Sequence, residues 1–461
     1  MTKDALLEER ISEWREYFRR RQAVKPADID ELEDHLRSQV DALSEAGLDA
    51  DEAFFVAVKR LGSMDSVARE FAGEYSERLW KQLVVAPGAE AASPVVQREA
   101  LVAIGLAAGA AIAIKVPELF GVHFDGPDHN EAFYAHNAMI LVLPFFAALF
   151  ALKRGMRAAG WFALAVPFVA AALIMNLMPF AGISNNVERQ TEILSVIHLP
   201  IGLWLTASLF AYVGGRWRSH DQRMNFVRFT GEWFIYYVLI ALGGAVLAGF
   251  TAFVFRAIGF NPEPLIAQWI VPCGAAGAIV IGAWLVEFKQ GVIENMAPVL
   301  TWLFTPLFTA LLLVFVATMV VTGNAISVER EVLIGFDLLL VLVLGLLLYA
   351  ISARDPQAPP RLFDRLQLLL VIAALVVDVL ALWAITARIS EFGFSPNKTA
   401  ALGLNILLLI NLGWSIVLYT RFLTGRSPFK ALERWQTAYL PAFAAWAWVV
   451  VAIFPVIFKY Q

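Results

Sequence analysis

The chain has 461 residues, of which 59% are hydrophobic and 16% are charged, and its formal net charge is −4. This composition excludes an ordinary soluble domain, which is about 45–50% apolar and about 25% charged. The charge gives no support to nucleic acid as a partner, and the single cysteine, Cys273, excludes an intrachain disulfide and a cysteine-based metal site. The first 25 residues are charged throughout, so we expect no secretory signal peptide.

Residues 1–83 predict a small helical domain in which acidic residues outnumber basic ones. Apolar residues recur there at helical spacing, and turn-forming residues divide them into four helices. Pro26 suits a first helical turn, Asp49 suits an N-terminal cap, and Gly47 and Gly62 are typical helix stops. We interpret the apolar stripes as the core of a small bundle. The alternative is that one stripe stays open for a partner helix.

Part of this domain has a recognisable pattern. An acidic helix is followed by the patterns G-x-x-x-x-E-A and A-x-x-R-L-G, and then by a short helix that ends in an aromatic residue. The residues of the pattern are Gly47, Glu52, Ala53, Ala57, Arg60, Leu61, Gly62 and Phe71. With this spacing, residues 31–71 resemble the HAAS-type module, also called permease prefix domain 1. The resemblance implies a cytoplasmic module that serves signalling or assembly and has no catalytic residues.

Residues 84–98 are small, contain Pro and Gly, and predict a flexible linker. The remainder, 99–461, predicts a transmembrane domain, because it contains about eleven apolar stretches near the 20 residues that cross a bilayer. Such stretches must be helices, since lipid satisfies no backbone polar group. The expected spans are 99–120, 135–152, 159–180, 193–213, 232–256, 267–287, 297–321, 332–351, 366–387, 400–420 and 439–458. The predicted fold class is an all-α polytopic membrane bundle with a small cytoplasmic N-terminal helical domain.

Loop charges predict the orientation of the bundle. The loops on the side of the N-terminal domain contain Lys153, Arg154, Arg157, Arg216, Arg218, Arg223, Arg228, Lys289, Arg354, Arg361, Arg365, Arg421, Arg426, Lys430 and Arg434. The opposite side contains Lys115, Arg189, Arg256, Arg330, Arg388, Lys398 and Lys459. Because basic loops stay in the cytoplasm, we expect a cell inner-membrane protein with a cytoplasmic N-terminus and an extracytoplasmic C-terminus.

Polar residues inside the expected spans are the candidates for a functional site, because each is costly in lipid unless it has a partner. The candidates are Asp337 in the eighth span, Asp378 in the ninth, Asn405 and Asn411 in the tenth, and His198 in the fourth. Two interpretations remain open. The residues form a polar cluster for proton or ion movement or for substrate binding, or they form a network that holds helices together.

Three segments resemble the DUF4153 group of bacterial integral membrane proteins. These are 197–205 (IHLPIGLWL), 388–398 (RISEFGFSPNK) and 432–441 (LERWQTAYLP). That family has no agreed activity, so the resemblance implies only a membrane protein of unknown function. Two interpretations of 388–398 remain open: an ordered cap over the outer ends of two spans, or a purely structural turn, which we favour. We expect Arg388 to pair there with Glu391 or Asp337.

Loops on both sides of the predicted bundle contain further candidate binding residues. The outer loop before the second span contains His123, His129 and His136 with interleaved acids, a set that zinc accepts. The spacing matches no closed metal motif, and exposed loops collect such residues by chance. The inner loops 216–233 and 420–436 mix Arg and Lys with aromatic residues, which predicts interfacial segments at anionic lipid headgroups.

Two functions follow from these features. The first is a regulatory, signalling or assembly protein whose N-terminal domain binds a cytoplasmic protein or the chain's own membrane loops. The alternative is a transporter or proton-coupled permease that uses Asp337, Asp378 and His198. No cofactor is expected, and no nucleophile–base pair or metal motif at catalytic spacing predicts an enzyme.

Overall fold

The computed structural model describes residues 7–8, 11, 26–45, 48–61, 94–123, 131–180, 189–257, 259, 261–288, 296–322 and 330–460. Every regular element in these residues is a helix, which agrees with the predicted all-α fold class. The described residues belong to two compact units, one before residue 95 and one after it.

The first unit contains α2 (Pro26–Glu45) and α3 (Ala50–Leu61). Pro26 opens α2 as expected, and the Asp49 side chain accepts a hydrogen bond from the Glu52 amide at 3.2 Å. The small core consists of Ile11, Leu36, Val40, Leu43, Ala53, Phe54 and Ala57. Arg37 binds Glu8 at 2.6 Å, and this hydrogen bond lowers the pKa of the Glu8 carboxyl. The predicted helix stops Gly47 and Gly62 lie outside the described residues.

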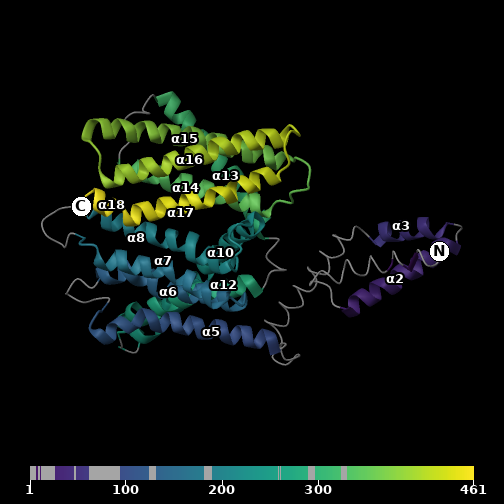
Figure 1. Cartoon of the computed structure of the whole chain (residues 1–461), viewed down its shortest axis with the longest axis horizontal. Helices are drawn as coiled ribbons and strands as arrows, with labels where there is room; N and C mark the ends of the chain where they lie inside the picture. Colours follow the sequence, from purple (N-terminus) through teal and green to yellow (C-terminus); the bar gives the residue numbers. More distant parts are fainter. Residues whose placement is uncertain are drawn as a thin grey trace. The chain divides into compact units, whose positions relative to one another are not determined.

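The second unit is a bundle of long apolar helices (Figure 1). Its elements are α5 (Pro94–Lys115), η1 (Val116–Phe120), α6 (Glu131–Lys153), α7 (Ala158–Leu177), α8 (Gln190–Leu203), η2 (Trp204–Ser208), α9 (Leu209–Tyr212), α10 (His220–Ala257), α11 (Glu263–Leu265), η3 (Ile266–Ile270), α12 (Val271–Phe288), α13 (Met296–Thr322), α14 (Arg330–Ala353), α15 (Leu362–Phe392), α16 (Pro396–Leu423), α17 (Lys430–Ala452) and α18 (Phe454–Ile457). Large apolar side chains remain exposed on the bundle, as lipid contact requires. The expected linker is shorter than predicted, because α5 already begins at Pro94.

Ten stretches among the described residues are long and apolar enough to cross a membrane. The eleventh expected span, 439–458, is not among them and stays a prediction. This segment is divided between α17 and α18, and α17 begins with Lys430, Glu433, Arg434 and Gln436. These polar residues lower its mean hydropathy, although the helix packs against α8 and α16 (Figure 1).

The bundle has two cores. The first is built mainly from α5 to α8, α10 and α12, and the second from α13 to α17. Helices α10 and α17 contribute to both: α10 places Phe226 in the first core and Met224 in the second, and α17 places Val451 in the first and Leu432 in the second. These two helices therefore join the halves of the bundle.

The structure corrects one loop prediction and agrees with the favoured form of another. The expected interfacial loop 216–233 is helical from His220 onward and continues into the fifth span as α10, whose 38 residues extend about 57 Å. The segment 388–398 contains only a short connection, because α15 runs to Phe392 and α16 starts at Pro396. Gly393 has φ 73°, and Ser395 caps α16 by accepting from the Lys398 amide. This geometry agrees with the favoured interpretation of the segment as a structural turn.

Four connections rich in arginine meet at one end of the bundle. They are 154–157, 213–219, 354–361 and 424–429, and we call this the Arg-rich end. Arg154 donates to the Tyr212 carbonyl at 3.1 Å, which joins the first two connections. The Arg354 guanidinium lies 4.3 Å from the centre of the Phe429 ring, which joins the last two. The sequence-based assignment of these loops to one side is consistent with this arrangement.

Candidate functional site

Asp378 is the most deeply buried acid of the described residues in the second unit. It lies in the middle of α15 with no exposed surface. Neither of its carboxylate oxygens has a hydrogen-bond partner among the described residues. A buried polar group without a partner is costly, and a charged one far more so. This position therefore differs from an ordinary structural acid.

Two further candidates meet beside it. The amide Nδ2 of Asn405 on α16 donates to Oδ1 of Asp337 on α14 at 2.9 Å. Asn405 is fully buried, and its own Oδ1 has no partner in the described structure. The carboxyl groups of Asp337 and Asp378 are near enough to interact electrostatically. Because α15 packs against both α14 and α16, three predicted residues from three helices form one site, here called the carboxylate cluster.

The expected ion pair at Asp337 is replaced by this neutral contact. Among described residues, no ion pair joins Asp337 to Arg388, and the hydrogen-bond donor to Asp337 is Asn405. Arg388 follows Asp378 by ten residues on α15, or about 15 Å along the helix, and so lies toward its end. Glu391 is exposed on the last turn. Asn405 meets Asp337 because α14 and α16 bring the two residues to the same depth.

The other intramembrane candidates have local roles. His198 donates from Nδ1 to the Leu194 carbonyl at 2.8 Å, a contact within α8. Asn411 donates to Oε1 of Gln436 at 3.0 Å, and Gln436 donates to Oγ of Ser415 at 2.8 Å. All three members of this network are buried, so it matches the interpretation in which polar residues hold helices together.

The histidine hypothesis gains no metal site. His136 lies with Nε2 2.9 Å from Oε1 of Glu192, His123 is exposed, and His129 lies outside the described residues. Within the described ranges, no group of three or more His, Cys, Asp or Glu side chains is placed to hold a metal ion. Glu192 was not a candidate from sequence. The sequence feature that could have identified it is an acidic residue in the first turn of a membrane-spanning helix.

A second strong polar contact was also missed. Arg354 and Asp364 pair through Nε to Oδ1 at 2.7 Å and Nη2 to Oδ2 at 3.1 Å. The guanidinium also lies over Phe422 and Phe429, 4.6 and 4.3 Å from the ring centres. This two-point geometry fixes the connection between α14 and α15. The sequence signal was a single acid at the start of an apolar run, three residues after an arginine.

The chain matches no protein-family model, no curated protein and no solved structure. The resemblances to HAAS-type modules and to the DUF4153 group therefore stay predictions from motifs.

Proposed function

We propose that this chain is a proton-coupled membrane protein of the transporter or permease class, in which the carboxylate cluster binds the proton. The single observation that supports this is Asp378, whose two buried oxygens have no partner in the described structure. Asp337 interacts with it electrostatically, and Asn405 holds Asp337 in place. Purely structural acids have donors, as Asp364 has Arg354.

The chemistry follows from the cost of charge in the membrane. A carboxylate at this depth costs a few kcal/mol, about 2.5–3.5 on insertion scales, unless it is paired or neutralised. Two neighbouring carboxyl groups also disfavour carrying two negative charges at once. The pair therefore retains a proton while it is sealed from water and releases it when water gains access. A change of access between the two sides would then couple proton release to a conformational change.

The proposed orientation places the Arg-rich end and the N-terminus in the cytoplasm of a bacterial cell. The basis is the positive-inside rule together with the meeting of four arginine-rich connections at one end. Asp337 lies seven residues from the start of α14, about 10 Å along the helix from the opposite end. Protons would thus reach the cluster by a shorter path from the extracytoplasmic side.

Infrared spectroscopy of the full chain in lipid nanodiscs tests the proposal. At pH 7 the wild type should show the C=O absorption of a protonated carboxyl group, with an isotope shift in D₂O. Asp378→Asn should remove this band, and Glu391→Gln, which changes an exposed carboxyl on the same helix, should not. An unchanged band in Asp378→Asn would contradict the proposal.

A regulatory role of the N-terminal residues is the second candidate. Its specific support is that the residues before 95 form a compact unit with a core of their own. The resemblance of residues 31–71 to permease prefix modules points the same way. Deletion of residues 1–83 should then change proton flux or the set of co-purified cytoplasmic proteins. If neither changes, this role is wrong, whatever the outcome at Asp378.

A further inference from the structure

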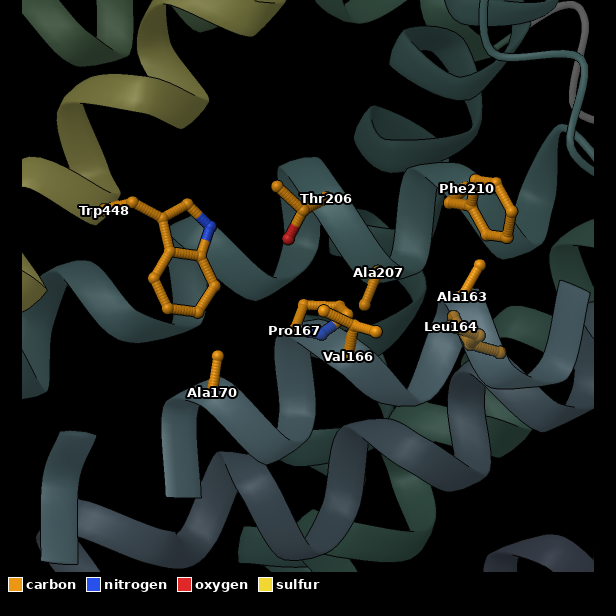
Figure 2. A pocket seen from close by; sticks show the side chains of 9 residues that line it. All are labelled: Ala163, Leu164, Val166, Pro167, Ala170, Thr206, Ala207, Phe210 and Trp448. Carbon is orange, nitrogen blue, oxygen red and sulfur yellow. The ribbon is translucent and has the colours of Figure 1, made fainter. Parts of the chain in front are cut away.

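A cavity of about 320 Å³ opens on the side of the bundle between α7, η2, α9 and α17 (Figure 2). Ala163, Val166 and Ala170 of α7 line one wall, and Thr206, Phe210 and Trp448 line the other. Figure 2 shows Trp448 near Ala170 toward one end and Phe210 near Ala163 toward the other. Because Ala163 and Val166 are exposed, the cavity is a groove that the surrounding membrane can reach.

The local structure keeps this groove open and apolar. Residues 204–208 form a π-helical turn, which widens α8 at this level and is typical of functional positions. Trp204 is held on the other side by its ring contact with Trp233 at 4.5 Å and by a hydrogen bond to Thr230. The one hydroxyl in the lining, on Thr206, donates to the Gly202 carbonyl at 2.6 Å. A ligand therefore finds a surface that is hydrocarbon apart from the Trp448 indole nitrogen, with no hydroxyl hydrogen left to satisfy.

The helices that form the groove are all within or packed against membrane-spanning stretches. In the hydrocarbon layer an unfilled groove loses dispersion contacts along its lining. The molecule that fills it must be apolar over the length of the groove. A hydrocarbon chain satisfies this requirement, and a polar metabolite does not.

The positively charged residues beyond one end of the groove indicate the kind of headgroup that the ligand has. Arg157 precedes Ala163 by six residues, about 9 Å along α7, and Arg216 follows Phe210 by six residues in the connection after α9, so both arginines lie beyond the same end of the groove. Both are exposed at the Arg-rich end and form no ion pair with any described residue. Their neighbours Lys153 and Arg154, in contrast, bind Glu287. Trp217 beside Arg216 is 48% exposed, as in aromatic belts at the lipid headgroups.

We propose that this groove is a binding site for an anionic phospholipid. One acyl chain lies between α7 and the π-helical turn, and the phosphate binds Arg157 and Arg216. Guanidinium groups bind phosphate oxygens at two points, which a zwitterionic headgroup with its own cation uses less well. The site is separate from the carboxylate cluster. Lipid binding in the groove is therefore additional to the proton binding proposed for the cluster.

Photocrosslinking of the full chain in vesicles tests the site. Phosphatidylglycerol with a diazirine on one acyl chain should label Ala163 to Ala170 and the region of Phe210 and Trp448. Phosphatidylcholine with the same acyl chain should label these residues several-fold less. The double variant Arg157→Gln with Arg216→Gln should lower labelling about ten- to thirtyfold, at roughly 1 kcal/mol for each arginine.

Matched variants separate the site from general lipid contact. Ala170→Trp fills the groove and should abolish labelling, whereas Leu173→Trp, on an exposed position of the same helix, should leave it unchanged. Arg365→Gln is the control for loss of an exposed charge. If Ala170→Trp does not fold, the arginine variants decide the result, because they change only exposed side chains. Equal labelling by both lipids, equal labelling of α10, or full competition by a free fatty acid would overturn the proposal.

Discussion

Asn405 and Asp337 form a 2.9 Å hydrogen bond between α16 and α14, in which a neutral amide is the donor to an acid inside a membrane-spanning stretch. Asp378 on α15, between these two helices in the chain, has no such donor among the described residues. The same site thus contains one acid with a partner and one without. The two acids should respond differently to substitution.

Asn405→Leu should destabilise the protein by about 1–3 kcal/mol, because it leaves Asp337 without its donor. Denaturation of the purified chain in detergent measures this loss. Asn397→Leu is a control on the same helix, since Asn397 makes no side-chain hydrogen bond to a described residue. Asp337→Leu combined with Asn405→Leu should be less damaging than the sum of the single changes. Strict additivity would show that the two residues do not interact.

Asp378→Leu should leave stability unchanged or increase it. Its carboxyl group gains no hydrogen bond from the described structure, so an apolar replacement removes only a buried polar group. The thermal midpoint in detergent should therefore stay at or above that of the wild type, while the infrared band of the protonated carboxyl disappears. A loss of several kcal/mol would mean that Asp378 has a structural partner.

Arg354→Met should cost about 3–5 kcal/mol, because it leaves Asp364 buried with an unpaired charge. Arg354→Lys should cost less but more than zero, since lysine keeps the charge and loses both the two-point contact and the ring stacking. The exposed Arg365, which begins the same helix with Asp364, provides the control as Arg365→Met. Similar losses at Arg354 and Arg365 would contradict the assigned pair.

Gly403→Ala should destabilise α16 by about 1–3 kcal/mol through overpacking. A Cβ atom at Gly403 would lie 2.0 Å from the Trp446 ring. Gly413→Ala on the same helix meets nothing within 4 Å and should be neutral or stabilising by up to about 1 kcal/mol. Denaturation midpoints of the two variants give a direct comparison. Trp446→Phe in the Gly403→Ala background should recover part of the loss.

Much of the bundle could be predicted from the apolar stretches, because lipid imposes helices of a known length. The predictions that differ from the structure are in segments where charge, hydrophobicity and packing favour different structures. His220 to Gly231 contains charges and aromatics that suit a loop or an interfacial helix, and packing on both cores makes it helical. The last expected span, 439–458, lies in a helix whose first turns contain polar residues, and α17 is therefore outside the ten apolar stretches.

The sequence indicated which residues belong to the candidate site, but it did not indicate which of them contact one another. Asp337, Asp378 and Asn405 stand out because polar residues are rare in apolar runs. Which donor meets which acid depends on the depth at which neighbouring helices pack, and a single sequence contains no measure of that depth. Arg388 was expected to pair with Glu391 or Asp337 from loop position alone, whereas Asn405 is the residue that the helix packing brings to Asp337. Ser415 and Gln436 were overlooked because their partners are on different helices.

The packing of α17 on α8 has a consequence for how the protein is made. Ser195 of α8 contacts the Val451 carbonyl, and Gly202 lies against Trp448. A ribosome delivers α8 to the membrane well before α17, and domains otherwise fold as they emerge. The helices synthesised first therefore remain in the bilayer, with the face of α8 that contacts α17 uncovered, until α17 is inserted. Assembly of the bundle thus finishes only after α17 has been synthesised.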